Sequence, residues 1–193
     1  MNSRSLKVKE ELGIQVGDIF IPEPQKDNIN FVNMGRLSPE KGQDNLIQAF
    51  AIFHKKHRNS KLYILGKGVL YEKLSELIDE LGLKDSVHLM GQMENPFRFI
   101  KKCDCFVLSS HYEGQPMVLL EAMTLEMKIV ATDIVANRAV LEDGKYGLLV
   151  KNSIGGLVEG MEKITSEEDS YVPQKFNYVK YNQEAMNSFY KCL

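Results

Sequence analysis

The sequence predicts an α/β fold, with a doubly wound parallel sheet of about six strands and helices on both faces. Three observations lead to this class. Short apolar runs alternate with longer amphipathic runs between residues 30 and 165, several apolar runs end in glycine, and no internal repeat or low-complexity tract interrupts the order. Strands that alternate with helices are typical of Rossmann-like parallel sheets, whose connections cover both faces.

The first part of the chain contains expected strands that end in glycine. They are residues 30–35 (NFVNMG), 61–66 (KLYILG) and 87–91 (VHLMG). A helix is expected over residues 43–57, because apolar side chains recur there at helical spacing and basic residues gather at its carboxyl end. A second, amphipathic helix is expected over residues 69–82, where Gly82 is a typical stop signal.

The second part of the chain continues the alternation with shorter elements. Helices are expected at residues 95–103 and 116–126, each with a proline near its first position, where the missing N–H costs nothing. A helical turn or two at residues 137–144 and a glycine-containing helix at residues 154–165 follow. The remaining strands are expected at residues 105–110, 128–133 and 147–150, and the aromatic-rich tail, residues 176–193, is a candidate helix.

Composition and charge narrow the classes of protein. The chain has 193 residues, with 24 Lys and Arg against 26 Asp and Glu, so its net charge of −2 argues against a nucleic-acid binder. No apolar run approaches the roughly 20 residues of a membrane span, and the first residues lack the apolar core of a secretory signal. We divide the chain into a connecting segment (1–28), an α/β domain (29–166), and a link with a closing helix (167–193).

The cysteines favour a structural interpretation. Cys103 and Cys105 approach an apolar strand, and Cys192 lies near the end of the chain. A single Cys-x-Cys pair is a poor zinc site, because structural zinc needs four nitrogen or sulfur ligands. We therefore expect buried thiols in a reducing compartment and no metal site.

The loop after the first strand combines a glycine with two cations. Gly35 permits a tight exit from the strand, and Arg36 and Lys41 follow it directly before the helix at residues 43–57. Cations beside a helix N-terminus suit a phosphate or diphosphate. The alternative is a solvated loop with two surface cations. The loop after the second strand carries Gly66-Lys67-Gly68, a Gly-x-Gly that turn geometry alone can explain, because position 71 is Tyr71 rather than the third glycine of a dinucleotide fingerprint.

The strand at residues 105–110 leads into a loop with a carboxylate and then a helix. Glu113 is expected at the carboxyl end of the sheet, near Arg36, and the N–H groups of Gln115, Met117 and Val118 are expected to be free at the helix start. Glu121 follows about five residues into the helix, roughly 7 to 8 Å further along. Because apolar residues surround Glu121, its carboxylate needs a partner, which favours a binding role over a surface charge.

Four motifs in this order resemble one family. The segments GRLSPEKGQD (35–44), LGKG (65–68), VHLMG (87–91) and EGQPMVLLEA (113–122) are similar to the C-terminal half of retaining GT-B glycosyltransferases, group 1 or family 4. Glu113 and Glu121 match the E-x7-E signature of that family. The resemblance extends from about residue 30 to 165 and includes a closing helix at the end of the chain.

The resemblance implies a donor site for a nucleoside diphosphate sugar, most simply a UDP-sugar, with no cofactor and no metal. It implies catalytic roles for Glu113, Arg36 and Lys41: the two cations would neutralise the diphosphate leaving group, and Glu113 would hold hydroxyls of the donor sugar. Glu121 would bind the ribose, and the backbone around Met90 would meet the base. The remaining implied donor-binding residues are Gly35, Gly114, Gln115, Pro116, Met117 and Val118, of which Gln115 and Pro116 stand where the family more often has Phe-Gly.

The resemblance also implies a partner and a location. A GT-B enzyme has a second Rossmann-like domain that carries most acceptor contacts, so we expect this chain to be the donor-binding half of a hexosyltransferase of cell-surface polysaccharide or glycoconjugate synthesis, inactive without that N-terminal domain. The expected location is the cytoplasm, with peripheral association of the whole enzyme at the inner membrane face left open. The alternatives are a nicotinamide-dependent oxidoreductase or epimerase domain and a non-catalytic α/β nucleotide-binding module.

Overall fold

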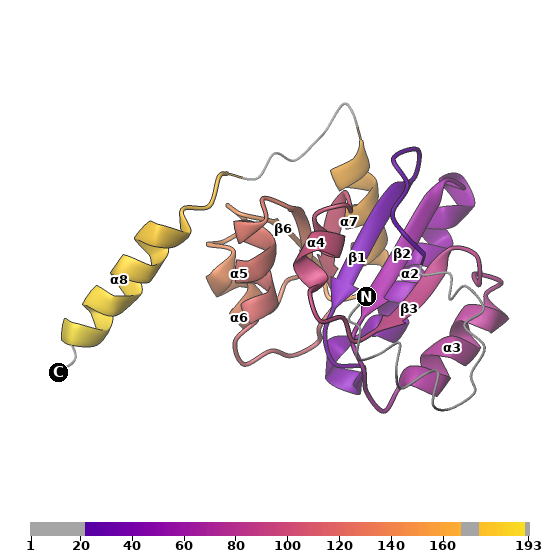
Figure 1. Cartoon of the computed structure of the whole chain (residues 1–193), viewed down its shortest axis with the longest axis horizontal. Helices are drawn as coiled ribbons and strands as arrows, with labels where there is room; N and C mark the ends of the chain where they lie inside the picture. The colour runs from indigo at the N-terminus through magenta and orange to yellow at the C-terminus, as the bar shows by residue number, and fades with distance from the viewer. Residues whose placement is uncertain (1–21, 167–173, 192–193) are drawn as a thin grey trace, which may run out of the picture.

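A computed structural model describes residues 22–166 and 174–191 (Figure 1). All strands are parallel and form one sheet in the order β3-β2-β1-β4-β5-β6, which confirms the predicted fold class. The strands are β1 (Ile29–Met34), β2 (Ser60–Leu65), β3 (Val87–Gly91), β4 (Cys105–Leu108), β5 (Lys128–Thr132) and β6 (Leu148–Val150). The strand order reverses between β1 and β4, so the crevice outside their carboxyl ends is where such folds bind ligands.

The helices divide between the two faces of the sheet. They are the 3-10 helix η1 (Pro39–Lys41), α2 (Gln43–Lys56), α3 (Tyr71–Glu80), α4 (Pro96–Ile100), α5 (Met117–Thr124), α6 (Val135–Val140), α7 (Ile154–Thr165) and α8 (Tyr178–Lys191). Side chains from α2, α3 and α7 share one core cluster, while those from α4 and α5 belong to a second. Figure 1 shows α8 extending away from the body of the sheet and helices.

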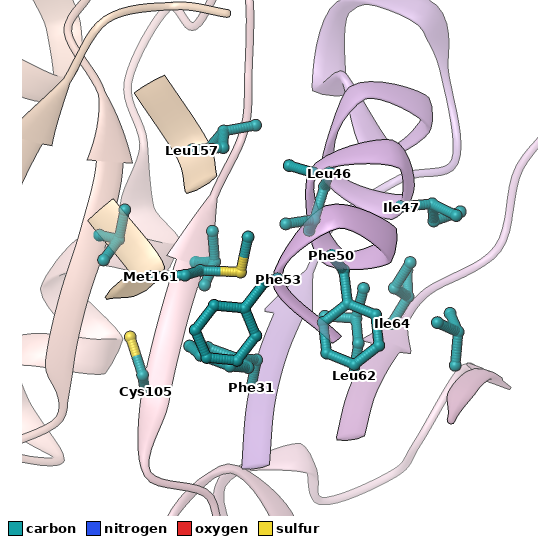
Figure 2. Packing of buried hydrophobic residues seen from close by; sticks show 14 of the residues in the cluster. Phe31, Leu46, Ile47, Phe50, Phe53, Leu62, Ile64, Cys105, Leu157 and Met161 are labelled. Atoms are coloured by element: carbon teal, nitrogen blue, oxygen red, sulfur yellow. The ribbon is translucent and has the colours of Figure 1, made fainter. Parts of the chain in front are cut away.

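The core lies on both faces because successive strand residues point in opposite directions. In β1, Phe31 belongs to the cluster under α2 and Val32 to the cluster under α5. Figure 2 shows Phe53 of α2 lying over Phe31, and these two rings meet edge to face with centroids 5.2 Å apart. The Phe50 ring also meets Phe31 edge to face, at a centroid distance of 6.3 Å. Burial on both faces explains why the strands appear in the sequence as continuous apolar runs.

Some helix boundaries differ from those expected. The helix expected at residues 95–103 is α4, which ends at Ile100, and that expected at 137–144 is α6, which begins at Val135 and ends at Val140. Glu142 and Asp143 have positive φ angles of 45° and 55°, which end the helical path before Gly144. Residues 1–21, most of the predicted connecting segment, and residues 167–173 and 192–193 lie outside the described residues, so the division of the chain into 1–28, 29–166 and 167–193 stays a prediction.

The two described cysteines have the structural role that their sequence context indicated. Cys103 and Cys105 are buried and free. Burial raises the pKa of the Cys103 thiol to about 12 and raises that of Cys105 as well. Both thiols are therefore protonated and unreactive at neutral pH.

A buried histidine joins α2 to the starts of two strands. Ser60 donates its hydroxyl proton to the carbonyl of His57 at 2.7 Å, so its oxygen accepts from His54 Nδ1 at 2.9 Å. Ser86 Oγ lies 3.2 Å from the other ring nitrogen of His54. Burial, with smaller contributions from Arg58 and Lys61, lowers the pKa of His54. The folded protein therefore holds this ring in its neutral form.

The free energy of unfolding is expected to fall as the pH drops through the ordinary histidine pKa of about 6.5. The unfolded chain takes up a proton there that folded His54 resists, so stability is present above this pH and declines below it. For one proton the slope is at most about 1.4 kcal/mol per pH unit. Urea unfolding between pH 8 and pH 5 should show a steeper decline for the wild type than for His54→Gln. Parallel curves would show that His54 titrates alike in both states.

Candidate functional site

Two loops at the switch point are held together through their backbones. The loop from β1 to α2 contains η1, and the loop from β4 to α5 begins at Ser109. His111 donates its N–H to the carbonyl of Glu40 at 2.8 Å, and Ser109 Oγ donates to the carbonyl of Lys41 at 2.9 Å. A Cβ on Gly42 would lie 2.3 Å from the carbonyl oxygen of Ser109, so only glycine permits this approach. The two loops thus occupy a fixed relative position.

The side chains of Lys41 and Glu113 form an ion pair across these loops. Lys41 Nζ donates to both carboxylate oxygens of Glu113, at 2.7 and 2.8 Å. Ser110 Oγ donates to the same carboxylate at 2.6 Å. The Glu113 side chain is only 7% exposed and that of Lys41 23% exposed, so solvent screens the pair weakly. The structure brings these two predicted residues together as partners of each other.

A cleft of about 360 Å³ opens at the ends of β1 and β2. Neither Lys41 nor Glu113 lines it, but a Cβ on its lining residue Gly35 would lie 3.8 Å from Lys41 Cδ. Its lining residues are Met34, Gly35, Arg36, Leu65, Gly66, Lys67, Gln92, Met93 and Pro96. Arg36 and Lys67 are exposed, and Gln43 Nε2 donates to the backbone carbonyl of Arg36 at 2.9 Å. We call this hollow the cationic cleft, because Arg36 and Lys67 are the charged residues in its lining.

The Gly-x-Gly loop is explained by close packing of two backbones. Gly66 has a φ of +141°, and a Cβ there would lie 1.9 Å from the carbonyl oxygen of Gly35. Gly35 donates its N–H to the carbonyl of Leu65, and Leu37 donates to that of Lys67, both at 3.0 Å. The loops after β1 and β2 therefore fit against each other, and the first glycine serves this contact rather than a dinucleotide.

The start of α5 differs in detail from the sequence expectation. Pro116 is buried and precedes the helix instead of occupying its first position, and the N–H of Met117 donates to the carbonyl of Gln115 at 2.9 Å. The expectation that this N–H is free was therefore wrong, because the chain turns at Pro116 before the helix begins. Among the described residues, the N–H groups of Gln115 and Val118 have no hydrogen-bond partner. Gly114 is exposed with open space around its Cα.

Glu121 lies in a second, apolar cleft of about 430 Å³. The lining residues are Phe97, Met117, Leu120, Glu121, Thr124, Leu125, Phe176, Tyr178, Tyr181 and Asn182. Glu121 Oε2 is buried and has no hydrogen-bond partner among the described residues, and burial raises the pKa of this carboxyl group. The two clefts are lined by neighbouring residues at the start of α4, Pro96 in the cationic cleft and Phe97 in the apolar one.

Met90 does not line the cationic cleft. It packs against the second core cluster and contributes to a hollow at β3 with Tyr71 and His88, while Gln92 and Met93 line the cationic cleft. Sequence reasoning missed Lys67, Gln92 and Met93. Lys67 gave a signal, since it lies between two glycines at a strand end, but a lone cation in a turn also suits a solvated surface.

The fold and the clefts define an α/β domain with two exposed cations, Arg36 and Lys67, in a cleft at the carboxyl end of a Rossmann-like sheet. The particular family follows from comparison: residues 18–184 match the model of the family described as glycosyl transferases group 1, and the chain belongs to that family. The predicted family is thus confirmed at the level of group 1, and the match does not support the oxidoreductase alternative.

Three similar proteins illustrate the relationship. An uncharacterized glycosyltransferase of Methanocaldococcus jannaschii is 41% identical over 156 residues, which cover 74% of this chain and 37% of that protein. The N-acetylgalactosamine-N,N'-diacetylbacillosaminyl-diphospho-undecaprenol 4-alpha-N-acetylgalactosaminyltransferase of Campylobacter jejuni is 33% identical, over 71% of this chain and 37% of that protein. The crystal structure of Staphylococcus aureus TarM with Fondaparinux, alpha-GlcNAc-glycerol and UDP has a TM-score of 0.66 and 26% identity, over 82% of this chain and 35% of TarM.

The chain thus spans little more than a third of the length of these similar proteins. Within the described residues, no helix has the length and apolar character that a membrane span requires.

Proposed function

We propose that this chain is the donor-binding domain of a retaining glycosyltransferase that uses a nucleoside diphosphate sugar, with UDP as the nucleotide. The observation that carries the proposal is the cationic cleft at the carboxyl ends of β1 and β2, whose lining residue Gly35 is a neighbour of the paired Lys41 side chain. Such a cleft suits the two phosphates, and the adjacent carboxylate suits sugar hydroxyls. UDP is favoured because TarM, a structure more than a quarter identical in sequence, binds it.

The residues have distinct roles in this proposal. In the transfer, the bond from the anomeric carbon to the diphosphate oxygen breaks with its electron pair on the diphosphate. An acceptor hydroxyl oxygen forms the new bond and gives up its proton to the departing diphosphate. Arg36 and Lys41 stabilise the charge that grows on the diphosphate, which makes them electrostatic catalysts. Glu113 accepts hydrogen bonds from hydroxyls of the donor sugar. The free N–H groups of Gln115 and Val118 donate to oxygens of the same sugar.

The ribose is assigned to Glu121. Its buried Oε2 lacks a hydrogen-bond partner among the described residues, and a ribose hydroxyl would supply one. Neighbouring residues at the start of α4 line the two clefts, and we assign one extended ligand to both, with its ribose at Glu121 and its diphosphate at Arg36. The base then lies toward Gln92 and Met93, with Met90 contributing only through the backbone of β3.

The whole enzyme is proposed to contain a second, acceptor-binding domain and to act in cell-surface polysaccharide or glycoconjugate synthesis. The Campylobacter jejuni protein supports this, since its name specifies a diphospho-undecaprenol-linked acceptor. A lipid-linked acceptor would place the enzyme at the inner face of the membrane, with peripheral association. Residues 1–193 alone are expected to bind donor without transferring sugar. Measurable sugar transfer by this chain would contradict the proposal that a second, acceptor-binding domain is required.

Replacing Arg36 by alanine is expected to weaken UDP binding by roughly 10- to 100-fold, the size of one charge-assisted contact to phosphate. Isothermal titration of a panel of nucleotides and nucleotide sugars into the 193-residue chain measures this. Arg58→Ala is the matched control, because Arg58 is exposed and follows α2 at the opposite end of the sheet. Equal affinities of Arg36→Ala and wild type would show that the diphosphate binds elsewhere. Tight NADH binding without UDP binding would replace the proposal by the oxidoreductase alternative.

A further inference from the structure

We propose that Lys67 is a phosphate-binding residue of the donor site and acts together with Arg36. This inference rests on the proposed function, and it adds a residue from the loop after β2 to the cations Arg36 and Lys41 of the loop after β1. The ligand chemistry is a nucleoside diphosphate. The proposal stands on the lining of the cationic cleft, on the balance of charge in the site, and on the backbone contacts that fix the two loops.

Lys67 and Arg36 line the same cleft from different strands. Arg36 follows β1 and Lys67 follows β2, and Gly35 and Gly66 bring the two backbones into contact between them. Both side chains are exposed, and neither forms a hydrogen bond or salt bridge with any part of residues 22–166 or 174–191. Two such cations in one cleft favour a ligand with more than one negative charge.

The charge of Lys41 is already balanced. Its ammonium group donates to both oxygens of the Glu113 carboxylate, and the pair is largely shielded from solvent. Glu40 accepts a hydrogen bond from Ser38 at 2.6 Å, and this bond is the main cause of the lowered pKa of its carboxyl group. Arg36 contributes least to that lowering, so it interacts only weakly with Glu40. Among the described residues, Arg36 and Lys67 are therefore the unpaired cations of the cleft, whereas the charge of Lys41 is shared between Glu113 and the proposed ligand.

The backbone fixes the position of Lys67. Its carbonyl accepts from Leu37, the residue after Arg36, at 3.0 Å, and Leu70 donates in turn to the carbonyl of Leu37 at 3.1 Å. These bonds tie the backbone of position 67 to that of the loop after β1, while the long side chains of Arg36 and Lys67 stay free to reach a ligand. Because the backbone is already ordered, binding an anion needs to order only the side chains.

Titrations of UDP, UMP and uridine into the 193-residue chain test the proposal. Lys67→Ala is expected to weaken UDP binding by about tenfold, the contribution of one charge-assisted phosphate contact. The loss should be smaller for UMP and absent for uridine, which carries no phosphate. Lys67→Arg should restore most of the UDP affinity. Lys73→Ala is the matched control, since Lys73 is an exposed lysine of α3 that does not line the cleft.

The outcomes separate this inference from the proposed function. Because Lys67 is exposed, its substitution should leave the thermal unfolding of the chain unchanged, so a loss of UDP binding reports on the cleft. If the wild type binds UDP, and Arg36→Ala weakens this binding while Lys67→Ala leaves it unchanged, the role of Lys67 is overturned and the proposed function stands. An equal loss for uridine and UDP would also overturn the role of Lys67. A wild-type chain that binds no nucleoside diphosphate would overturn the proposed function and this assignment with it.

Discussion

Gly66→Ala is expected to lower the free energy of unfolding by about 4 kcal/mol or more, which places it among the most damaging single substitutions. The added Cβ would lie 1.9 Å from the Gly35 carbonyl oxygen, which belongs to backbone and cannot rotate away. The φ of +141° adds a backbone conformation that alanine rarely adopts. Urea unfolding measures the loss.

A matched control for this substitution lies in α7. Gly155 is exposed and a Cβ there meets nothing within 4 Å, so Gly155→Ala is expected to be neutral or to stabilise the helix by about 0.5 kcal/mol. Any Gly66→Ala protein that folds should also lose UDP affinity, because the loop that carries Arg36 must shift to admit the new methyl group. A Gly66→Ala protein as stable as the wild type would show that the two loops can separate at little cost.

The second large effect concerns the ion pair of Lys41 and Glu113. Substitutions of its two members are expected to change the affinity for UDP in opposite directions. Lys41→Met is expected to lower stability by about 2 kcal/mol, since it leaves a nearly buried carboxylate with only Ser110 as donor. It should also weaken UDP binding. Glu113→Gln removes the charge that neutralises Lys41, so the ammonium group attracts the diphosphate more strongly and UDP binds more tightly.

A nucleotide sugar distinguishes the two functions of Glu113. Glu113→Gln and Glu113→Ala should weaken the binding of a UDP-sugar relative to UDP, because the carboxylate no longer accepts from sugar hydroxyls. Titration of UDP and a UDP-sugar into Lys41→Met, Glu113→Gln and the double variant measures both effects and their coupling. Glu113→Gln with unchanged affinity for both ligands would remove Glu113 from the donor site.

Continuous apolar runs made the sheet predictable. All residues of β4 are buried because helices cover both faces of the sheet, and such a strand appears in the sequence without polar interruption. Helix ends were harder to predict, since they depend on local turns. Pro116 precedes α5 instead of being its first residue, and residues with positive φ angles follow α6. Strand-end loops were singled out because parallel strands place their carboxyl ends together, and the structure brings the loops after β1, β2 and β4 close to one another.

Side-chain partners across distant loops could not be derived in the same way. Lys41 and Glu113 are 72 positions apart in the sequence, and each was assigned to a different part of the ligand rather than to the other. Lys67 was overlooked because one cation between glycines has no periodicity or spacing to mark it. The apolar surroundings of Glu121 were expected from its own helix, but the contributions of Phe97, Tyr178 and Tyr181 depend on how α4 and the end of the chain come together.

The backbone contacts between the loops after β1 and β2 have a consequence for how the family can diversify. Main-chain hydrogen bonds and a glycine fix the walls of the cationic cleft, whereas the exposed side chains of Lys67 and Gln92 contribute nothing to that frame. Donor preference and folding are therefore encoded in separate sets of atoms. A library randomised at positions 67 and 92 should retain the native fold in most of its members, which makes this domain a scaffold on which the proposed nucleotide preference can be altered.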